Sequence, residues 1–186
     1  MTVAVTLKSE TCRTLLEAWL AARGDRLLPR RADLDPVMLK SIMPNISIFE
    51  IREPGVVMVR LAGTHYREIF GFEPTGRNLI DLTPEQFRRV RAYRLRLAAN
   101  WPCAGRGEIN VRFGSQTFDT FEFLTLPLDA DSTRMLISAT ASVSGRRWQN
   151  APSRDLIEAS SEDSQYVDIG AGLPPAWDPP DDFLPP

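Results

Sequence analysis

Few side chains in this sequence can act as nucleophiles or metal ligands: two cysteines, Cys12 and Cys103, and one histidine, His65. A chain with a single histidine cannot build a multi-histidine metal centre, so no metal site is predicted. Two cysteines in 186 residues do not make a disulfide scaffold, and both are predicted to be reduced thiols. The glycines form neither a P-loop nor a dinucleotide-binding motif.

Four side chains have the chemistry of a general acid or base: Tyr66, Tyr93, Asp119 and His65. Small isomerases and dehydratases place such groups in a cavity. The spacing of these four along the chain favours no particular pair. The sequence therefore offers no catalytic residue, and a binding protein is expected rather than an enzyme.

One arginine is predicted to lie among apolar residues. Thr83-Pro84-Glu85-Gln86 is a capping sequence that opens a helix over residues 84–101. Four apolar residues of this helix fall within an arc of about 80°; they are Phe87, Val90, Leu97 and Trp101. Arg94 falls inside the same arc. A buried guanidinium needs an anion or a path to solvent. Arg94 is therefore expected either to bind a carboxylate or phosphate of a ligand, or to reach past the core or pair with an acid such as Glu122.

The same helix carries five arginines and one glutamate, a net charge of +4. Such a helix can contact nucleic acid or anionic lipid, but a solvated face is more common, and nucleic acid is not predicted as a partner. Residues 150–186 hold one basic and eight acidic residues, a net charge of −7, with seven of the 15 prolines. One hypothesis is that this tail folds back onto the helix until a protein partner displaces it.

A first helix is expected from about Ser9, a plausible N-cap, to Arg23, before Gly24. Its apolar residues gather on one face; they are Leu15, Leu16, Trp19 and Leu20. This face is predicted to pair two subunits, because a two-fold homodimer is the commonest oligomer. The alternative is that the helix docks on its own sheet. Asp35-Pro36 is a second helix start.

Five segments have the composition or alternation of strands; they are Asn45–Arg52, Val56–Ala62, Glu108–Phe113, Thr117–Leu126 and Met135–Val143. The first two flank a tight turn and form a hairpin. Short connections join the last three. One five-stranded antiparallel sheet with helices against it is expected, an α+β fold.

A ligand cavity would lie between this sheet and the helix over residues 84–101. The apolar sides of the later strands are predicted to form its floor, with Val111, Phe113, Ile137 and Ala139 among them. Ala139 is small where a larger residue could stand. That leaves either room for a ligand or a place where helices pack closely.

The whole chain has a net charge of −2 and 43% hydrophobic residues, enough for a core in one domain. No segment reaches the roughly 18–20 apolar residues of a transmembrane helix. The N-terminus lacks the pattern of a secretory signal. The cytoplasm is the expected location.

The order of the elements and the local amino-acid sequence resemble those of PAS domains. The segment VVMVRLAGTHYREIFGFEPTGRNLIDL at residues 56–82 is similar to the passage of PAS proteins from the second strand into a helix. The lead-in LLPRRADLDPVMLKSIMPNISIFEI and the later YVDIGAGLP are similar to a group of small, stand-alone PAS proteins frequent in alphaproteobacteria, whose function is largely unknown.

This resemblance implies a PAS domain over residues 31–146 with a five-stranded sheet and a helical crossover on one face. Residues 1–30 are expected to form the N-terminal helix and lead-in, and the acidic, proline-rich residues 147–186 are expected to form a largely irregular tail. The resemblance implies a sensor or adaptor that binds a small molecule or a protein and has no output domain of its own. PAS haem ligands usually lie further along than His65, and neither cysteine has the flavin-adduct context, so haem and photoactive flavin are not expected.

Two alternatives remain at this point. One is a cone-shaped isomerase or dehydratase of the nuclear-transport-factor type, and the other is an interaction module without a ligand. Strand order distinguishes the first, because a PAS sheet places its first strand centrally, beside the last.

Overall fold

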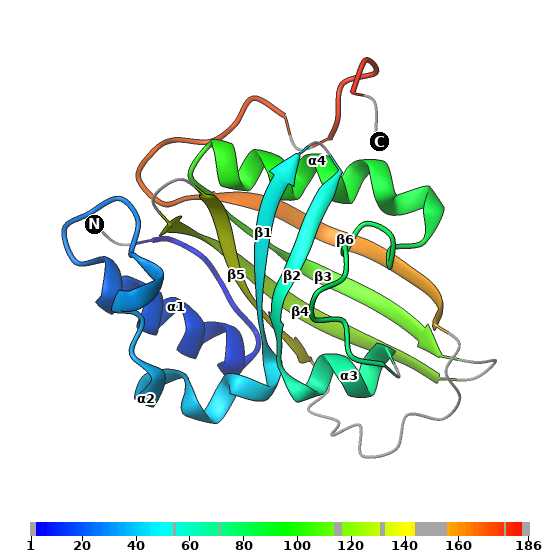
Figure 1. The fold of residues 1–186 in the computed structure, drawn as a ribbon, viewed down its shortest axis with the longest axis horizontal. Helices are drawn as coiled ribbons and strands as arrows, with labels where there is room; N and C mark the ends of the chain where they lie inside the picture. Colours follow the sequence, from blue (N-terminus) through cyan, green and yellow to red (C-terminus); the bar gives the residue numbers. More distant parts are fainter. Residues whose placement is uncertain are drawn as a thin grey trace.

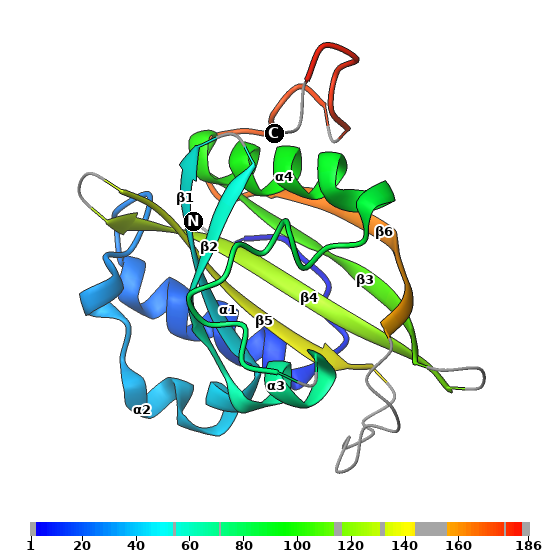
Figure 2. The same cartoon turned by 45° about the vertical axis from the view of Figure 1, so that its right-hand side comes forward.

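The computed structural model describes residues 3–53, 55–70, 72–113, 117–130, 133–143, 156–176 and 178–183. Within them the chain forms one six-stranded antiparallel sheet with helices on both faces (Figures 1 and 2). The helices are α1 (Glu10–Arg23), α2 (Pro36–Leu39), α3 (Thr64–Phe70) and α4 (Glu85–Asn100), with short 3-10 helices over Arg31–Asp33 and Lys40–Asn45. The strands are β1 (Ile46–Glu53), β2 (Val56–Ala62), β3 (Cys103–Phe113), β4 (Thr117–Ala130), β5 (Thr133–Ser142) and β6 (Leu156–Asp168).

The start signals of the first two helices act as predicted. The hydroxyl of Ser9 accepts a hydrogen bond from the backbone N–H of Cys12 at 3.2 Å, which satisfies one of the free N–H groups at the start of α1. Gly24 ends the helix with a φ of 56°, a left-handed conformation that glycine adopts without steric cost. Asp35 caps α2 by accepting from the N–H of Val37 at 2.8 Å.

The strand order across the sheet is β2-β1-β5-β4-β3-β6. The first strand is therefore an inner strand, between β2 and β5, and β5 is the last strand of the five expected from the sequence. This is the arrangement that the PAS resemblance predicts, and it answers the question of strand order in favour of that fold. The expected α+β class and antiparallel sheet are confirmed.

The sheet has one strand more than expected. Part of the tail predicted to be largely irregular forms β6, which pairs antiparallel with β3 from Cys103↔Asp168 to Phe113↔Leu156. The sequence of this segment does not indicate a strand, because its acidic and polar residues show no clear alternation of apolar and polar positions. Backbone pairing with the open edge of β3 supplies the stabilisation instead. Gly107 permits a close approach there, because a Cβ at this position would overlap Ser164.

Two apolar clusters pack against opposite faces of the sheet. One lies between the sheet and α1, with Leu15, Trp19 and Ile137 at its centre, and the other lies under α4. Figure 2 shows α1 and α4 on opposite sides of the strands. The cluster under α4 is the one that borders a cavity.

Candidate functional site

A cavity of about 380 Å³ lies between α4 and the sheet. The segment that leads from α3 to α4 closes one side of it through residues such as Pro74, Leu79 and Leu82. Apolar side chains form most of the wall, including Phe49 of β1, Phe87 of α4, and Phe121 and Phe123 of β4. A volume of this size falls within the usual range for small-molecule sites.

Gly105 of β3 leaves part of the cavity floor open. It pairs with Thr125 of β4 on one side and Tyr166 of β6 on the other, and all three residues line the cavity. A Cβ built on Gly105 would meet no atom within 4 Å. Glycine inside a strand weakens the strand and often marks a place where a ligand approaches the backbone.

Hydroxyl groups form a hydrogen-bonded edge on the β1 and β5 side of the cavity. The hydroxyl of Ser47 donates to the phenol oxygen of Tyr66 at 3.1 Å, and Tyr66 donates to Thr140 at 2.9 Å. Ser138 and Thr125 share a further hydrogen bond of 2.9 Å. Burial raises the pKa of Tyr66 above its ordinary value, so its phenol is neutral near pH 7.

The guanidinium of Arg91 also lines the cavity. Its Nη1 donates to the hydroxyl of Thr83 at 3.1 Å, and Thr83 in turn donates to the backbone oxygen of Leu79 at 2.8 Å. Burial lowers the pKa of Arg91 below its ordinary value. Thr83 is therefore part of the cavity wall. It does not cap α4 as predicted, since α4 begins after Pro84 without a side-chain cap.

Arg94 lines the cavity beside the C-terminal segment. Its Nη2 donates to the carboxylate of Asp178 at 2.7 Å, so its described acidic partner is Asp178 and not Glu122. Glu122 lies fully buried on the opposite side, where its two oxygens accept from the backbone N–H groups of Lys8 and Ser9 at 2.8 and 2.7 Å.

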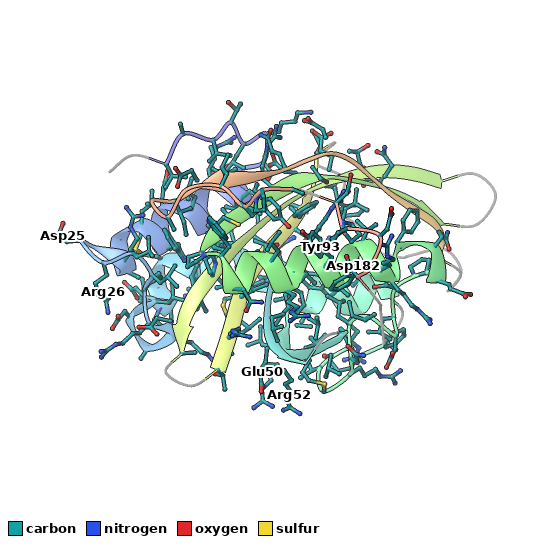
Figure 3. All side chains as sticks on the ribbon, turned by 90° about the horizontal axis from the view of Figure 1, so that it is seen from above. Asp25, Arg26, Glu50, Arg52, Tyr93 and Asp182 are labelled. Atoms are coloured by element: carbon teal, nitrogen blue, oxygen red, sulfur yellow. The ribbon has the colours of Figure 1, made fainter. Side chains whose placement is uncertain are left out.

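The C-terminal segment over residues 178–183 lies along α4, as the tail hypothesis expected. Arg89 donates to the backbone oxygens of Pro180 and Phe183 at 2.6 and 3.0 Å, and the rings of Tyr93 and Phe183 meet edge to face at 5.1 Å. Figure 3 shows Tyr93 next to Asp182 in this region. Arg94 and Asp178 form an ion pair here, whereas Arg89 donates to neutral backbone oxygens.

Seven of the nine predicted cavity residues divide into three groups. Phe87, Val90 and Arg94 line the cavity, as expected. Leu97 and Trp101 do not line it, and Trp101 is 41% exposed. The side chains of Val111 and Phe113 lie outside the described residues.

Ile137 and Ala139 lie on the wrong face of β5 for the predicted floor. Both are buried in the cluster under α1. Ser138 and Thr140 of the same strand face the cavity instead. The apolar side of β5 was expected under the cavity, but α1 needs that side, because a helix must bury its apolar face against apolar residues. A cavity can accept hydroxyl groups that bond to one another.

Sequence reasoning also missed Arg91, Thr83 and Gly105 as cavity residues. Arg91 sits at the edge of the apolar arc of α4, beside the place that the helical pattern gave to Arg94. The serines and threonines of β5 were a visible signal, because they alternate regularly along one face of the strand.

The residues predicted to pair two subunits contact their own chain. Leu15 and Trp19 are fully buried, and the indole of Trp19 donates to the backbone oxygen of Pro127 at 2.8 Å. Leu16 and Leu20 are partly buried against the same cluster. In the structure this helix docks on its own sheet, which was the alternative expectation.

His65, Cys12 and Cys103 are not among the residues that line the cavity. His65 is close to Glu68, with 3.6 Å between Nδ1 and Oε2, and burial lowers its pKa. Cys12 and Cys103 are free thiols, and burial raises the pKa of each to about 12. Among the described residues, no cluster of three or more histidine, cysteine or acidic side chains is placed to hold a metal ion.

In the described part of the chain, no helix has both the length and the apolarity needed to cross a bilayer.

No curated protein matches the sequence. A family model described as a PAS domain matches residues 7–140, a range that begins shortly before α1 and ends within β5. The match covers well over half of the chain, and its limits enclose the inner first strand, the helical crossover and most of the cavity wall. Sequence, strand order and family model agree, and the chain belongs to the PAS domain family.

Proposed function

We propose that this PAS domain is a sensor or adaptor that binds a small, mainly apolar molecule in the cavity between α4 and the sheet. The observation that carries the proposal is the cavity of about 380 Å³ whose floor is left open at Gly105. A strand gives up stability when it holds glycine instead of a β-branched residue. Space for a ligand is a reason for that choice.

The proposed role is binding and not catalysis. Tyr66 lines the cavity, but Asp119 and His65 are not among its lining residues. The described lining contains no carboxylate and no imidazole that could exchange a proton with a substrate. This supports a sensor over an isomerase or dehydratase.

The signal is proposed to leave through α4 and the segment over residues 178–183. One side of α4 lines the cavity through Phe87, Val90 and Arg91, and the helix also holds the C-terminal segment through Arg89. A ligand that moves α4 would therefore alter the surface that a protein partner meets. The cytoplasm is the proposed location, and two free, buried cysteines are consistent with a reducing compartment.

A graded series at Gly105 tests ligand binding. Gly105→Ala adds one methyl group to open space, and Gly105→Leu fills part of the cavity from its floor. Binding of the neutral probe 1-decanol, measured by titration calorimetry, should be nearly unchanged in the first variant and at least tenfold weaker in the second. Native mass spectrometry of the purified wild type should show a retained small molecule that Gly105→Leu lacks. Equal binding by wild type and Gly105→Leu would show that the cavity is not the site, and no binding by either would favour the ligand-free interaction module.

A further inference from the structure

The cavity contains a guanidinium whose charge no described carboxylate balances. Arg91 has a single described hydrogen bond, from Nη1 to the hydroxyl of Thr83. A guanidinium carries five N–H donors, so most of those on Arg91 have no described protein acceptor. None of the described residues that line the cavity is acidic.

The other arginines of α4 that carry described contacts donate to backbone oxygens or to a carboxylate. Arg88 donates to the backbone oxygens of Thr83 and Asp81, at 2.8 and 3.2 Å. Arg89 donates to the C-terminal segment, and Arg94 pairs with Asp178. Arg91 differs from these three because its only described acceptor is a neutral hydroxyl.

The neighbours of Arg91 hold its guanidinium without neutralising it. Thr83 directs its own proton to the oxygen of Leu79, so its lone pair is turned to accept from Arg91. Tyr66 is electrostatically coupled to Arg91, but its phenol stays neutral because burial raises its pKa. A desolvated charge without a counter-ion is costly, and an anion placed beside it relieves that cost.

We propose that the ligand of this cavity is a monocarboxylic acid with an apolar body, whose carboxylate pairs with Arg91. The proposal rests on the proposed function, since it names the chemical class that the same cavity binds. One unbalanced guanidinium matches one negative charge, and its planar fork fits a carboxylate with two parallel hydrogen bonds.

The rest of the cavity sets the size and character of the ligand body. The aromatic side chains of Phe49, Phe87, Phe121 and Phe123 provide an apolar wall. A cavity of about 380 Å³ has the volume of roughly a dozen water molecules in the liquid. A medium-chain or aromatic acid with about that number of non-hydrogen atoms fits this space, and decanoic acid is a convenient probe.

Calorimetric titration of the full chain with decanoic acid and with 1-decanol tests the class. The two probes share the same chain and differ in charge. Wild type should bind decanoate roughly 10- to 100-fold more tightly than decanol, as expected for charge-assisted hydrogen bonds. Arg91→Met keeps an apolar stem of similar length, and it should lose this preference while retaining its affinity for decanol. Decyl phosphate serves as the dianionic comparison and should bind less tightly than decanoate.

Arg96→Met is the matched control. It removes the same charge from the same helix at a residue that does not line the cavity, so it should keep the preference for decanoate. An equal loss in Arg91→Met and Arg96→Met would assign the effect to the general charge of α4 and would overturn the proposal. Equal affinity of wild type for decanoate and decanol, or tighter binding of decyl phosphate, would also overturn it and leave the proposed function intact. Failure of every probe to bind would reject the proposed function as well.

Discussion

The guanidinium of Arg94 lies 2.7 Å from the carboxylate of Asp178, a residue 84 positions further along the chain. The side chain of Arg94 is 20% exposed and that of Asp178 is 74% exposed, so the pair lies at the surface where α4 meets the C-terminal segment. Arg94, which the helical pattern placed among apolar residues, thus forms an ion pair with an acid that does not line the cavity. Arg91, three residues earlier, also lines the cavity, and its described acceptor is the neutral hydroxyl of Thr83.

Removing this ion pair should loosen the C-terminal segment without unfolding the domain. Exposed pairs contribute about 0–1 kcal/mol, so Asp178→Asn should change the free energy of unfolding by less than about 1 kcal/mol. Hydrogen exchange of residues 178–183 should become faster, and added salt should have the same effect on the wild type because it screens the pair. Asp182→Asn removes the same charge from the same segment, where no ion pair is described, and should change exchange little. Equal effects of the two variants would mean that net charge, and not this pair, holds the segment.

The buried carboxylate of Glu122 should be important for stability. It accepts the backbone N–H groups of Lys8 and Ser9 just before α1, where the helix dipole favours a negative charge. Glu122→Gln keeps the shape but removes the charge, and it should lower the free energy of unfolding by about 1–3 kcal/mol in urea denaturation. Glu17→Gln, at an exposed position of α1, should stay within about 0.5 kcal/mol of wild type. A loss no greater than that of the control would show that the N–H groups are satisfied without the charge.

The stability of the domain should depend on pH through His65. Burial lowers its pKa in the folded state, although the nearby Glu68 and Asp119 oppose this. The unfolded chain therefore binds the proton more readily, and stability should fall as the pH drops below about 6.5. The loss should amount to about 1.4 kcal/mol for each unit by which the folded and unfolded pKa values differ.

The chain has a single histidine, so His65→Gln provides a clean comparison. Denaturation midpoints measured from pH 8 to pH 5.5 should decline in the wild type and stay nearly level in His65→Gln. The same slope in both proteins would assign the pH dependence to carboxylates instead.

Docking of α1 on its own sheet makes Leu15 a core residue of the monomer. Leu15 is fully buried, and Leu15→Ala should lower the free energy of unfolding by about 2–5 kcal/mol because it leaves a cavity. Val37, which is 77% exposed on α2, offers the control Val37→Ala with a change below about 0.5 kcal/mol. The melting temperatures of both should not vary with protein concentration. A melting temperature that rises with concentration would indicate that subunit association contributes to burying this face.

The sequence by itself determined the local elements of this protein. Ser9 and Asp35 begin helices because their side chains accept from free N–H groups nearby in the chain. The β1–β2 hairpin follows from two β-rich segments beside a tight turn. The identity of the fold also followed from the order of these elements and from the amino-acid sequence of residues 56–82. These features depend on neighbours in the sequence, so the sequence carries them.

Only the tertiary structure decided which face of each element meets which neighbour. Alternation along β5 shows that Ile137 and Ala139 share a face, but α1 and the cavity compete for that face, and only the packed fold assigns it to α1. The same holds for the pairing of β6 with β3 and for Asp178 against Arg94. Periodicity fixes which side chains point the same way. The element that covers them comes from distant parts of the chain, and its choice depends on burial and charge balance summed over the whole fold.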